Sequence, residues 1–188
     1  IAVMERVLSY DQHYDAVIQA GYGEHGREGL QELLNVPVVD ITEAAASVAM
    51  LLGHRYSVVT TLDRTVPLIE DRLKLAGLDS RCASVRASGL AVLELEEDPQ
   101  RAIESVVREA EEAVRVDKAE VICLGCGGMV GLDERIQART GVPVVDGVTA
   151  AVALAESLVR LKLSTSKVRT YAPPRPKQIL GWPRALLG

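Results

Sequence analysis

The sequence predicts an α/β protein whose parallel sheets are covered by helices on both faces. Two observations support this: short apolar runs rich in β-branched residues alternate with amphipathic segments, and a long stretch of the chain occurs twice. Strands buried on both faces appear as nearly continuous hydrophobic runs, and regular β-α alternation is typical of parallel sheets. The 188 residues are enough for two small lobes that share a cleft.

The individual elements follow from these patterns, taken in chain order. Asp98-Pro99 is a typical helix start, and Gly77 and Gly141 stand where helices are expected to end. Strands are predicted at residues 16–20, 37–40, 56–61, 82–86, 120–124 and 143–146. Helices are predicted near residues 24–34, 42–53, 65–76, 99–116, 129–139 and 148–162.

An internal repeat organises the chain. The sequence NVPVVDITEAAASVA at 35–49 returns as GVPVVDGVTAAVALA at 141–155, and the upstream DAVIQAGYG corresponds to AEVICLGCG. The repeated unit is a strand, a Gly-rich loop, a helix, a second strand and an Ala-rich helix. We therefore expect two pseudo-symmetric lobes with four-stranded parallel sheets and an active site between them. The first lobe is expected to comprise residues 1–44 plus 148–188, and the second residues 45–147.

The two halves of the repeat differ in what precedes them. Two strands, 56–61 and 82–86, come before the strand at 120–124, whereas residues 2–8 resemble only the end of a helix such as 102–114. If the halves are equivalent, the first lobe is expected to lack its N-terminal strands.

Composition excludes several classes of function. The net charge is −5 with Lys and Arg scattered, and only 3% of residues are aromatic, so we expect no nucleic-acid surface. No apolar run approaches the ~20 residues of a membrane helix, so no membrane partner is expected. Three cysteines do not form a secreted disulfide framework, which favours a cytoplasmic protein. The Pro-rich tail with Trp182 is interpreted as a contact in a homo-oligomer.

Residues 21–26, Gly-Tyr-Gly-Glu-His-Gly, spell G-x-G-x-x-G after an apolar run, and Asp40 ends the next one. This pattern is a dinucleotide-binding fingerprint when its loop follows the first strand of a βαβ unit. Here the repeat makes the loop follow a third strand, and Asp146 occupies the position equivalent to Asp40. A dinucleotide-binding module therefore stays an alternative rather than the favoured function.

The loop at 125–129, Gly-Cys-Gly-Gly-Met, is the best candidate for chemistry. Cys126 stands between a predicted buried strand and a predicted helix, where unpaired N–H groups and the helix dipole favour a thiolate usable as a base or nucleophile. The N–H groups of Gly127 and Gly128 can stabilise an enolate or carboxylate. The alternative is that Cys126 is a small buried hydrophobic residue. Cys123 is predicted to lie in the core and Cys82 to be structural.

Thr60 and Thr61 are further candidates. They end a predicted strand, and ligands bind at the C-terminal edge of parallel sheets. Their hydroxyls are therefore expected to hold a carbonyl or carboxylate, while capping of the helix near residue 65 explains at most one of them. The histidines and cysteines show no metal-ligand spacing, so no metal is expected.

These segments together resemble a known family. The sequences VICLGCGGM, GVPVVDGVTAA, TSKVRTYAPP and GHRYSVVTTLDRTVP are similar to the hydantoin and allantoin racemases of the aspartate/glutamate racemase superfamily, over about residues 15–174. The resemblance implies cofactor-independent racemisation at an acidic carbon of a 5-substituted hydantoin or a related ring. Two cysteines would face each other across the cleft, one removing the Cα proton and the other returning one.

One position departs from the family pattern. Cys126 matches the second family cysteine, but the first would stand where this chain has Gly21. Glycine transfers no proton, so three explanations are open: an engineered change, a replacement base such as His25 or Glu24, or a reaction that needs one base. Arylmalonate decarboxylases, which resemble these racemases, keep only the second cysteine, but the segments around Cys126 and the C-terminal tail of this chain are more similar to hydantoin racemases. His25 has the alternative role of an exposed residue at a helix start.

The resulting prediction is an isomerase without cofactor or metal, with a one-cysteine decarboxylase as the alternative. Cys126 is the predicted catalytic residue and His25 the candidate second acid/base. The predicted substrate-binding residues are Gly21, Tyr22, Gly23, Thr60, Thr61, Gly125, Gly127 and Gly128.

Overall fold

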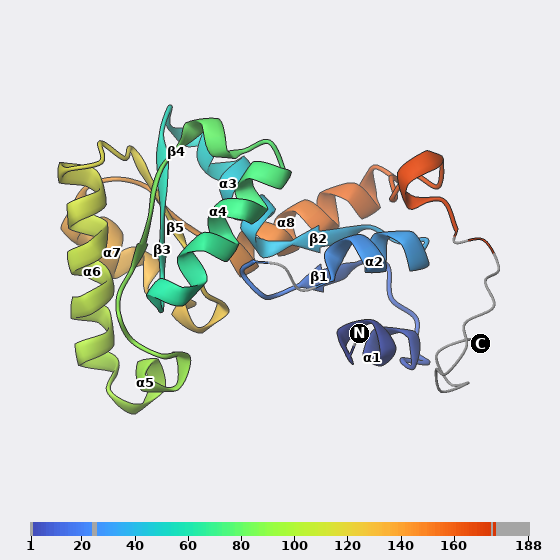
Figure 1. The fold of residues 1–188 in the computed structure, drawn as a ribbon, viewed down its shortest axis with the longest axis horizontal. Helices are drawn as coiled ribbons and strands as arrows, with labels where there is room; N and C mark the ends of the chain where they lie inside the picture. The colour runs from blue at the N-terminus through green and yellow to red at the C-terminus, as the bar shows by residue number, and fades with distance from the viewer. Residues whose placement is uncertain (1, 24–25, 174, 176–188) are drawn as a thin grey trace.

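The computed structural model describes residues 2–23, 26–173 and 175, and its strands form two parallel sheets (Figure 1). The larger sheet has the order β4-β3-β5-β6, and the smaller pairs β1 with β2. The strands are β1 (Val17–Gln19), β2 (Val38–Asp40), β3 (Tyr56–Thr60), β4 (Cys82–Ala87), β5 (Val121–Leu124) and β6 (Val144–Asp146). The helices are α1 (Ala2–Leu8), α2 (Arg27–Leu33), α3 (Ile41–Leu52), α4 (Val66–Leu75), α5 (Val92–Glu97), α6 (Pro99–Arg115), α7 (Asp133–Thr140) and α8 (Gly147–Arg160).

The predicted strands and the α/β fold class are confirmed, with strand ends shifted by a residue or two. Helix α6 begins at Pro99 and is capped by the Asp98 side chain, which accepts a hydrogen bond from the Arg101 N–H at 3.1 Å. Gly141 ends α7 with φ of 73°. The helix expected near 129–139 was placed too early, because Gly131 adopts a left-handed φ of 86° and α7 begins only at Asp133.

The repeat has the same strand register in both sheets. Gln19 pairs with Asp40 at the end of β1 and β2, and Leu124 pairs with Asp146 at the end of β5 and β6. Both aspartates then cap the following helix: Asp40 accepts from the N–H groups of Thr42 and Glu43, and Asp146 from that of Thr149. A buried N-cap of this kind satisfies orphan N–H groups of the first turn. The repeat therefore reflects two equivalent structural units.

Each face of the larger sheet packs into its own core, which explains why its strands are apolar throughout. Val59, Ile122 and Leu124 face α6 and α7, and the alternating residues Val58 and Cys123 face α3 and α4. Figure 1 shows α6 and α7 on the side of this sheet away from β1 and β2. The core on the α3 side continues through α8 toward the smaller sheet.

Helices α3 and α8, the Ala-rich helices of the repeat, pack against each other at the centre of the molecule (Figure 1). Helix α3 contacts β3, β5 and β6 of the larger sheet and also β2, the strand that it follows, whereas α8 contacts β1 and β2 of the smaller sheet and also β6, the strand that it follows. Buried alanines, among them Ala45 and Ala151, allow this close packing. These contacts accord with the predicted division into residues 1–44 plus 148–188 and 45–147, which stays a prediction.

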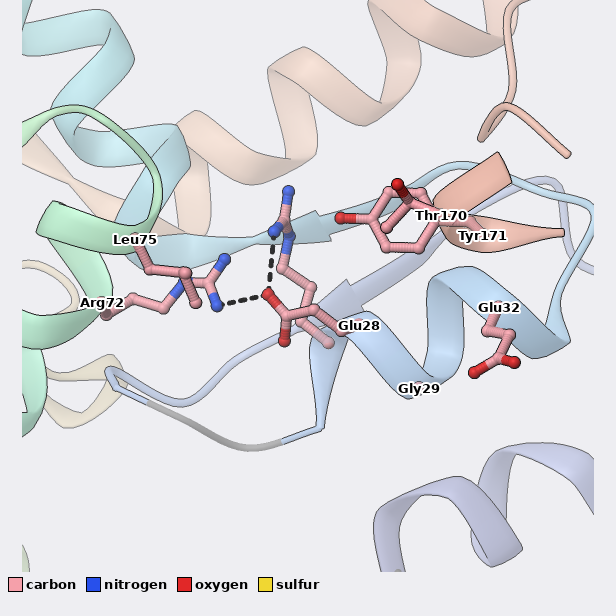
Figure 2. A pocket seen from close by; sticks show the side chains of 8 residues that line it. Glu28, Gly29, Glu32, Arg72, Leu75, Thr170 and Tyr171 are labelled. Atoms are coloured by element: carbon pink, nitrogen blue, oxygen red, sulfur yellow. Dashed lines mark hydrogen bonds and ion pairs between the residues drawn. The ribbon is translucent and has the colours of Figure 1, made fainter. Parts of the chain in front are cut away.

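A buried arginine links α4 to the two helices that flank β2. Arg72 of α4, whose side chain is 1% exposed, donates to Glu28 of α2 at 2.5 Å and also to Glu43 of α3. Figure 2 shows Arg72 and Glu28 pointing toward each other. Arg27 completes the network by pairing with Glu43 at 2.7 Å. Burial alone would raise the pKa of the Glu28 carboxyl, but the hydrogen bond from Arg72, a backbone hydrogen bond and the charges of Arg72 and Arg27 together outweigh it, so this pKa lies below its ordinary value of 4.5.

We expect Arg72→Met to destabilise the protein at pH 7 by about 1–3 kcal/mol, less than for a fully buried pair because Glu28 is partly exposed. A lowered carboxyl pKa stabilises the fold above the unfolded value and loses that effect as pH falls. The difference between wild type and Arg72→Met should therefore shrink below about pH 4.5. Urea unfolding at several pH values measures it.

Arg115→Met is the matched control, because Arg115 pairs with Glu112 on the exposed face of α6. This change is expected to leave the free energy of unfolding unaltered. Equal effects of the two substitutions, or a difference that grows with acidification, would contradict the role of Arg72.

Candidate active site

The site is built at the C-terminal edge of the larger sheet, where Gly125 follows the end of β5. The Gly125 N–H donates to the Val59 carbonyl at 2.7 Å. A Cβ at position 125 would lie 2.7 Å from Val58 Cγ1, 2.9 Å from the Val59 oxygen and 3.0 Å from Thr60 Cβ. Since real Cβ atoms do not approach so closely, only glycine fits here. Because of this close approach, the residue that follows β5 lies directly against the C-terminal end of β3.

Cys126 follows in an extended conformation, with φ of −159° and ψ of 137°. It is half-buried, and its Sγ accepts a hydrogen bond from the Gly128 N–H at 3.4 Å. Met129, fully buried, anchors the loop in the core, and its N–H donates to the Cys126 carbonyl at 3.1 Å. Cys126 is therefore a half-buried thiol at the edge of the sheet, and its sulfur accepts a hydrogen bond from a backbone N–H.

The helix that was expected to support this thiol is shorter than predicted. Residues Gly127–Met129 form a single 3-10 turn, and the regular helix α7 starts only at Asp133. The backbone donor that contacts Cys126 Sγ is therefore the Gly128 N–H, and no long helix begins at this loop. Gly127 is half-buried and Gly128 is exposed, so both can face a ligand.

The other two cysteines lie apart from this edge, as predicted. Cys123 is fully buried in β5, and burial raises the pKa of its thiol. Cys82 is half-buried at the start of β4, and burial raises the pKa of its thiol to about 11. All three cysteines are free. Of the three, Cys126 alone stands in a loop at the C-terminal edge of the sheet.

Gly21 occupies the position equivalent to Cys126, because both follow by two residues the strand residue that pairs with the capping aspartate. The buried Gln19 amide braces this loop. Its nitrogen, when oriented toward acceptors, donates to Asp40 Oδ2 at 2.6 Å and to the Gly21 carbonyl at 3.2 Å, and its oxygen accepts from the Gly21 N–H at 3.3 Å. The loop is therefore held firmly although it carries no side chain at Gly21.

Tyr22 and Gly23 anchor the rest of this loop. The Tyr22 ring packs into the central core, so close to Gly147 that a Cβ there would lie 3.2 Å from its Cε2 atom. Burial raises the pKa of the Tyr22 hydroxyl, and the thiol of Cys123 adds to the shift. The Gly23 N–H donates to the Thr42 hydroxyl at 3.4 Å. Tyr22 is thus a half-buried side chain that packs against the core, and its predicted role in binding substrate stays a prediction.

The two equivalent loops are neighbours in space. A Cβ placed on Gly127 would lie 3.6 Å from the carbonyl oxygen of Ala20, the residue before Gly21. A groove of about 330 Å³ reaches Gly21 along the open edge of β1. A second cavity of about 350 Å³, beside Arg72, contains neither Gly21 nor Cys126 (Figure 2). Gly127 of one loop thus lies close to Ala20 of the other, while the predicted cleft between the two loops stays a prediction.

The two threonines at the end of β3 behave differently. Thr60 is 1% exposed, and its hydroxyl donates to the Gly125 carbonyl at 3.0 Å instead of facing a ligand. The Thr61 hydroxyl has no hydrogen bond within the described part of the chain, while its carbonyl accepts from the Gly89 N–H at 2.8 Å. Among the described residues, the Thr60 hydroxyl is thus engaged, whereas that of Thr61, which is 5% exposed, is not; the predicted roles of both in binding substrate stay predictions.

The candidate second base, His25, lies outside the described residues, as does Glu24. In the part of the chain that the structure describes, no three His, Cys, Asp or Glu side chains are grouped to hold a metal ion. None of the helices described is both long and apolar enough to cross a membrane.

Two equivalent loops, one bearing a half-buried thiol, are the arrangement that the predicted racemase site requires. Residues 2–155 match the family model for Asp/Glu/Hydantoin racemase. The chain is 49% identical to a hydantoin racemase of Rhizobium meliloti, covering 90% of this chain and 70% of that protein. The chain belongs to the Asp/Glu/Hydantoin racemase family, and the predicted isomerase class is confirmed.

The solved structures agree. The crystal structure of an allantoin racemase from Pseudomonas fluorescens is 82% identical and superposes with a TM-score of 0.94, covering 96% of this chain and 77% of that one. An unliganded arylmalonate decarboxylase, 21% identical, superposes with a TM-score of 0.57 over 77% of this chain and 66% of that one. This second likeness shows a shared fold and does not favour the decarboxylase alternative.

The dinucleotide-binding alternative conflicts with the position of Asp40. In the fingerprint, the acidic residue hydrogen-bonds a ribose. Here Asp40 is 1% exposed, caps α3 and accepts from Gln19, so its carboxylate is not free for a ribose. The interpretation of Asp40 and Asp146 as equivalent residues of the repeat explains them instead.

One residue and one contact that shape the site were not predicted from the sequence. Gln19, which braces Gly21, was hidden within an apolar strand, and its only signal is a polar residue at the end of that strand. The hydrogen bond from Thr60 to Gly125 joins residues 65 positions apart, and no sequence pattern reports such a contact.

We expect alkylation at pH 8 by iodoacetamide to modify Cys126 and to spare Cys123 and Cys82 in the folded protein. Cys123 is buried, and burial leaves both thiols protonated at this pH. Peptide mapping by mass spectrometry measures the modification at each site. In urea all three cysteines should react, which is the control; labelling of Cys123 at the rate of Cys126 in the native protein would contradict the assignment.

Proposed function

We propose that the protein acts on a hydantoin- or allantoin-type ring and that Cys126 moves the proton at its acidic Cα. The single observation that carries this proposal is the half-buried Cys126 thiol beside the loop of Gly21. Its substrate class follows the hydantoin and allantoin racemases to which the chain is similar. Ring carbonyls acidify the Cα–H, so no cofactor is needed to stabilise the carbanion.

The residues have complementary roles in this mechanism. The thiolate of Cys126 removes the proton and the resulting thiol returns one to the same face of the carbon. The backbone N–H groups of Gly127 and Gly128 and the hydroxyl of Thr61 are the donors proposed for the enolate oxygen or the ring carbonyls. Gly21 and Gly23 let the opposite loop approach the ring closely.

Because Gly21 has no side chain that could carry a proton, the stereochemical outcome of the proposed reaction is limited. A single thiol reaches one face of the ring, so only the enantiomer whose Cα–H faces Cys126 exchanges its proton. Inversion requires an acid on the other face. We therefore propose that this protein exchanges one enantiomer with retention and racemises slowly. A second base at His25 would instead give racemisation at a rate that matches exchange.

The first test follows each enantiomer of a 5-substituted hydantoin separately in D2O. We expect loss of the Cα–H signal in the NMR spectrum of one enantiomer only, with optical rotation retained and with no exchange in Cys126→Ser. Exchange accompanied by an equal loss of rotation would show a second base, and His25→Ala would then test it. No exchange with either hydantoin or allantoin enantiomers would overturn the proposed substrate class.

A second test restores the missing thiol. Gly21 is not among the glycines with a left-handed φ, so a cysteine is compatible with its backbone. We expect Gly21→Cys to raise racemisation to the rate of exchange, and Gly21→Ser, of similar size, not to do so. Gly21→Cys combined with Cys126→Ser should exchange the opposite enantiomer. If that double variant keeps the original preference, the two loops do not serve opposite faces.

We propose further that the protein works as a homo-oligomer in the cytoplasm. Large apolar side chains such as Leu51, Leu75 and Val168 are more than two-thirds exposed, which supports contacts with other subunits. Three free cysteines accord with a reducing compartment.

A further inference from the structure

Thr60 lies where it can control the Cys126 loop without touching a ligand. It is the last residue of β3, is 1% exposed, and its hydroxyl donates to the Gly125 carbonyl at 3.0 Å. The Gly125 N–H is held on the same strand by the Val59 carbonyl at 2.7 Å. Both polar groups of the residue before Cys126 are therefore fixed to β3.

Which acceptor the Thr60 hydroxyl hydrogen reaches follows from the donors and the distances around it. Thr60 also lies 3.3 Å from the Thr65 hydroxyl, but Thr65 donates its own hydrogen to the Leu62 carbonyl at 2.7 Å. A hydroxyl has one hydrogen to donate. The Thr60 hydrogen thus has two possible acceptors, and the Gly125 carbonyl, at 3.0 Å, is nearer than the Thr65 hydroxyl, so the hydrogen is assigned to Gly125.

The Gly125 carbonyl belongs to the peptide bond that leads into Cys126. Because that bond is planar, fixing the carbonyl also fixes the direction of the Cys126 N–H and the start of the Cys126 side chain. Without the Thr60 hydroxyl, the Gly125 carbonyl would lose a buried partner and rotation of this peptide would be easier. The hydrogen bond from the Gly128 N–H to Cys126 Sγ, at 3.4 Å, depends on the same course of the backbone.

We propose that Thr60 is a positioning residue for Cys126: its hydroxyl sets the orientation of the thiol through the Gly125 carbonyl. Gln19 holds the Gly21 loop in a comparable way, through the N–H and carbonyl of Gly21 itself. Each loop thus has one buried side chain that binds its backbone. The catalytic consequence rests on the proposed function, whereas the effect on Cys126 reactivity does not.

The test compares Thr60→Val, which keeps the shape and removes the hydroxyl, with Thr60→Ser, which keeps the hydroxyl. Ser57→Ala is the matched control, because Ser57 is equally buried at the other end of β3 and bonds to Ser84 at 2.8 Å. Three readouts are measured for each variant: the free energy of unfolding, the alkylation rate of Cys126 without substrate, and kcat and KM of Cα–H exchange.

For Thr60→Val we expect slower Cys126 alkylation and a kcat about 10- to 100-fold lower with KM nearly unchanged, because a small displacement of a catalytic group has effects of this size. Thr60→Ser should restore both, and Ser57→Ala should lower stability alone. Should Thr60→Val not fold, Thr60→Cys, a weaker donor, replaces it.

Two results would overturn the proposal. A raised KM with kcat unchanged would make Thr60 a substrate contact, and an effect on alkylation no larger than that of Ser57→Ala would make the hydrogen bond merely structural. If no variant and no wild type exchanges the substrate, the alkylation rates still decide the role of Thr60, and it is the proposed function that fails.

Discussion

The close approach of Gly125 to the end of β3 is the constraint on which the position of Cys126 depends. With Val58, Val59 and Thr60 all within about 3 Å of where a Cβ would lie, the chain after β5 has one available path. That path places Cys126 in extended conformation at the sheet edge and turns the next three residues into a 3-10 turn. The apolar core beneath, from Ile122 to Met129, makes the strand end rigid, so a loop of small residues is held in place without a long helix behind it.

The loop that faces it is held by different means. β1 pairs only with β2 in the described part of the chain, so no neighbouring strand supports Gly21 as β3 supports Gly125. Gln19, Tyr22 and Thr42 provide that support instead, through a side-chain amide, a buried ring and a hydroxyl. Burial, and to a smaller extent the nearby carboxylates of Asp40 and Asp146, raises the pKa of the Tyr22 hydroxyl. The phenol of Tyr22 therefore stays neutral. The loops are equivalent in register and different in how they are fixed.

The sequence was sufficient for most of the fold and for placing the loop of the proposed reacting group. Apolar runs predicted the strands because most of them are buried, although β4 is only half-buried, and the repeat predicted the equivalence of Gly21 and Cys126, which the strand register reproduces. What failed depended on backbone conformation or on long-range contacts. The left-handed φ of Gly131 delays α7, and the hydroxyl of Thr60 turns to Gly125 because β3 and β5 are adjacent. A threonine at a strand end looks the same in a sequence whether it binds a ligand or a carbonyl.

The duplication also explains why an asymmetric site can persist on a symmetric scaffold. Asp40 and Asp146 cap equivalent helices, but the residue that pairs with each differs: Gln19 donates to the second oxygen of Asp40, and Leu124 has nothing to donate to Asp146. The Asp146 Oδ2 atom is accordingly buried without a hydrogen-bond partner in the described part of the chain. An uncompensated carboxylate oxygen costs stability, yet Leu124 fills the core below the Cys126 loop. In each half, the residue at the end of the strand therefore suits its own loop. A thiol introduced at Gly21 would be positioned by Gln19 and Tyr22, whereas Thr60 is the residue proposed to position Cys126.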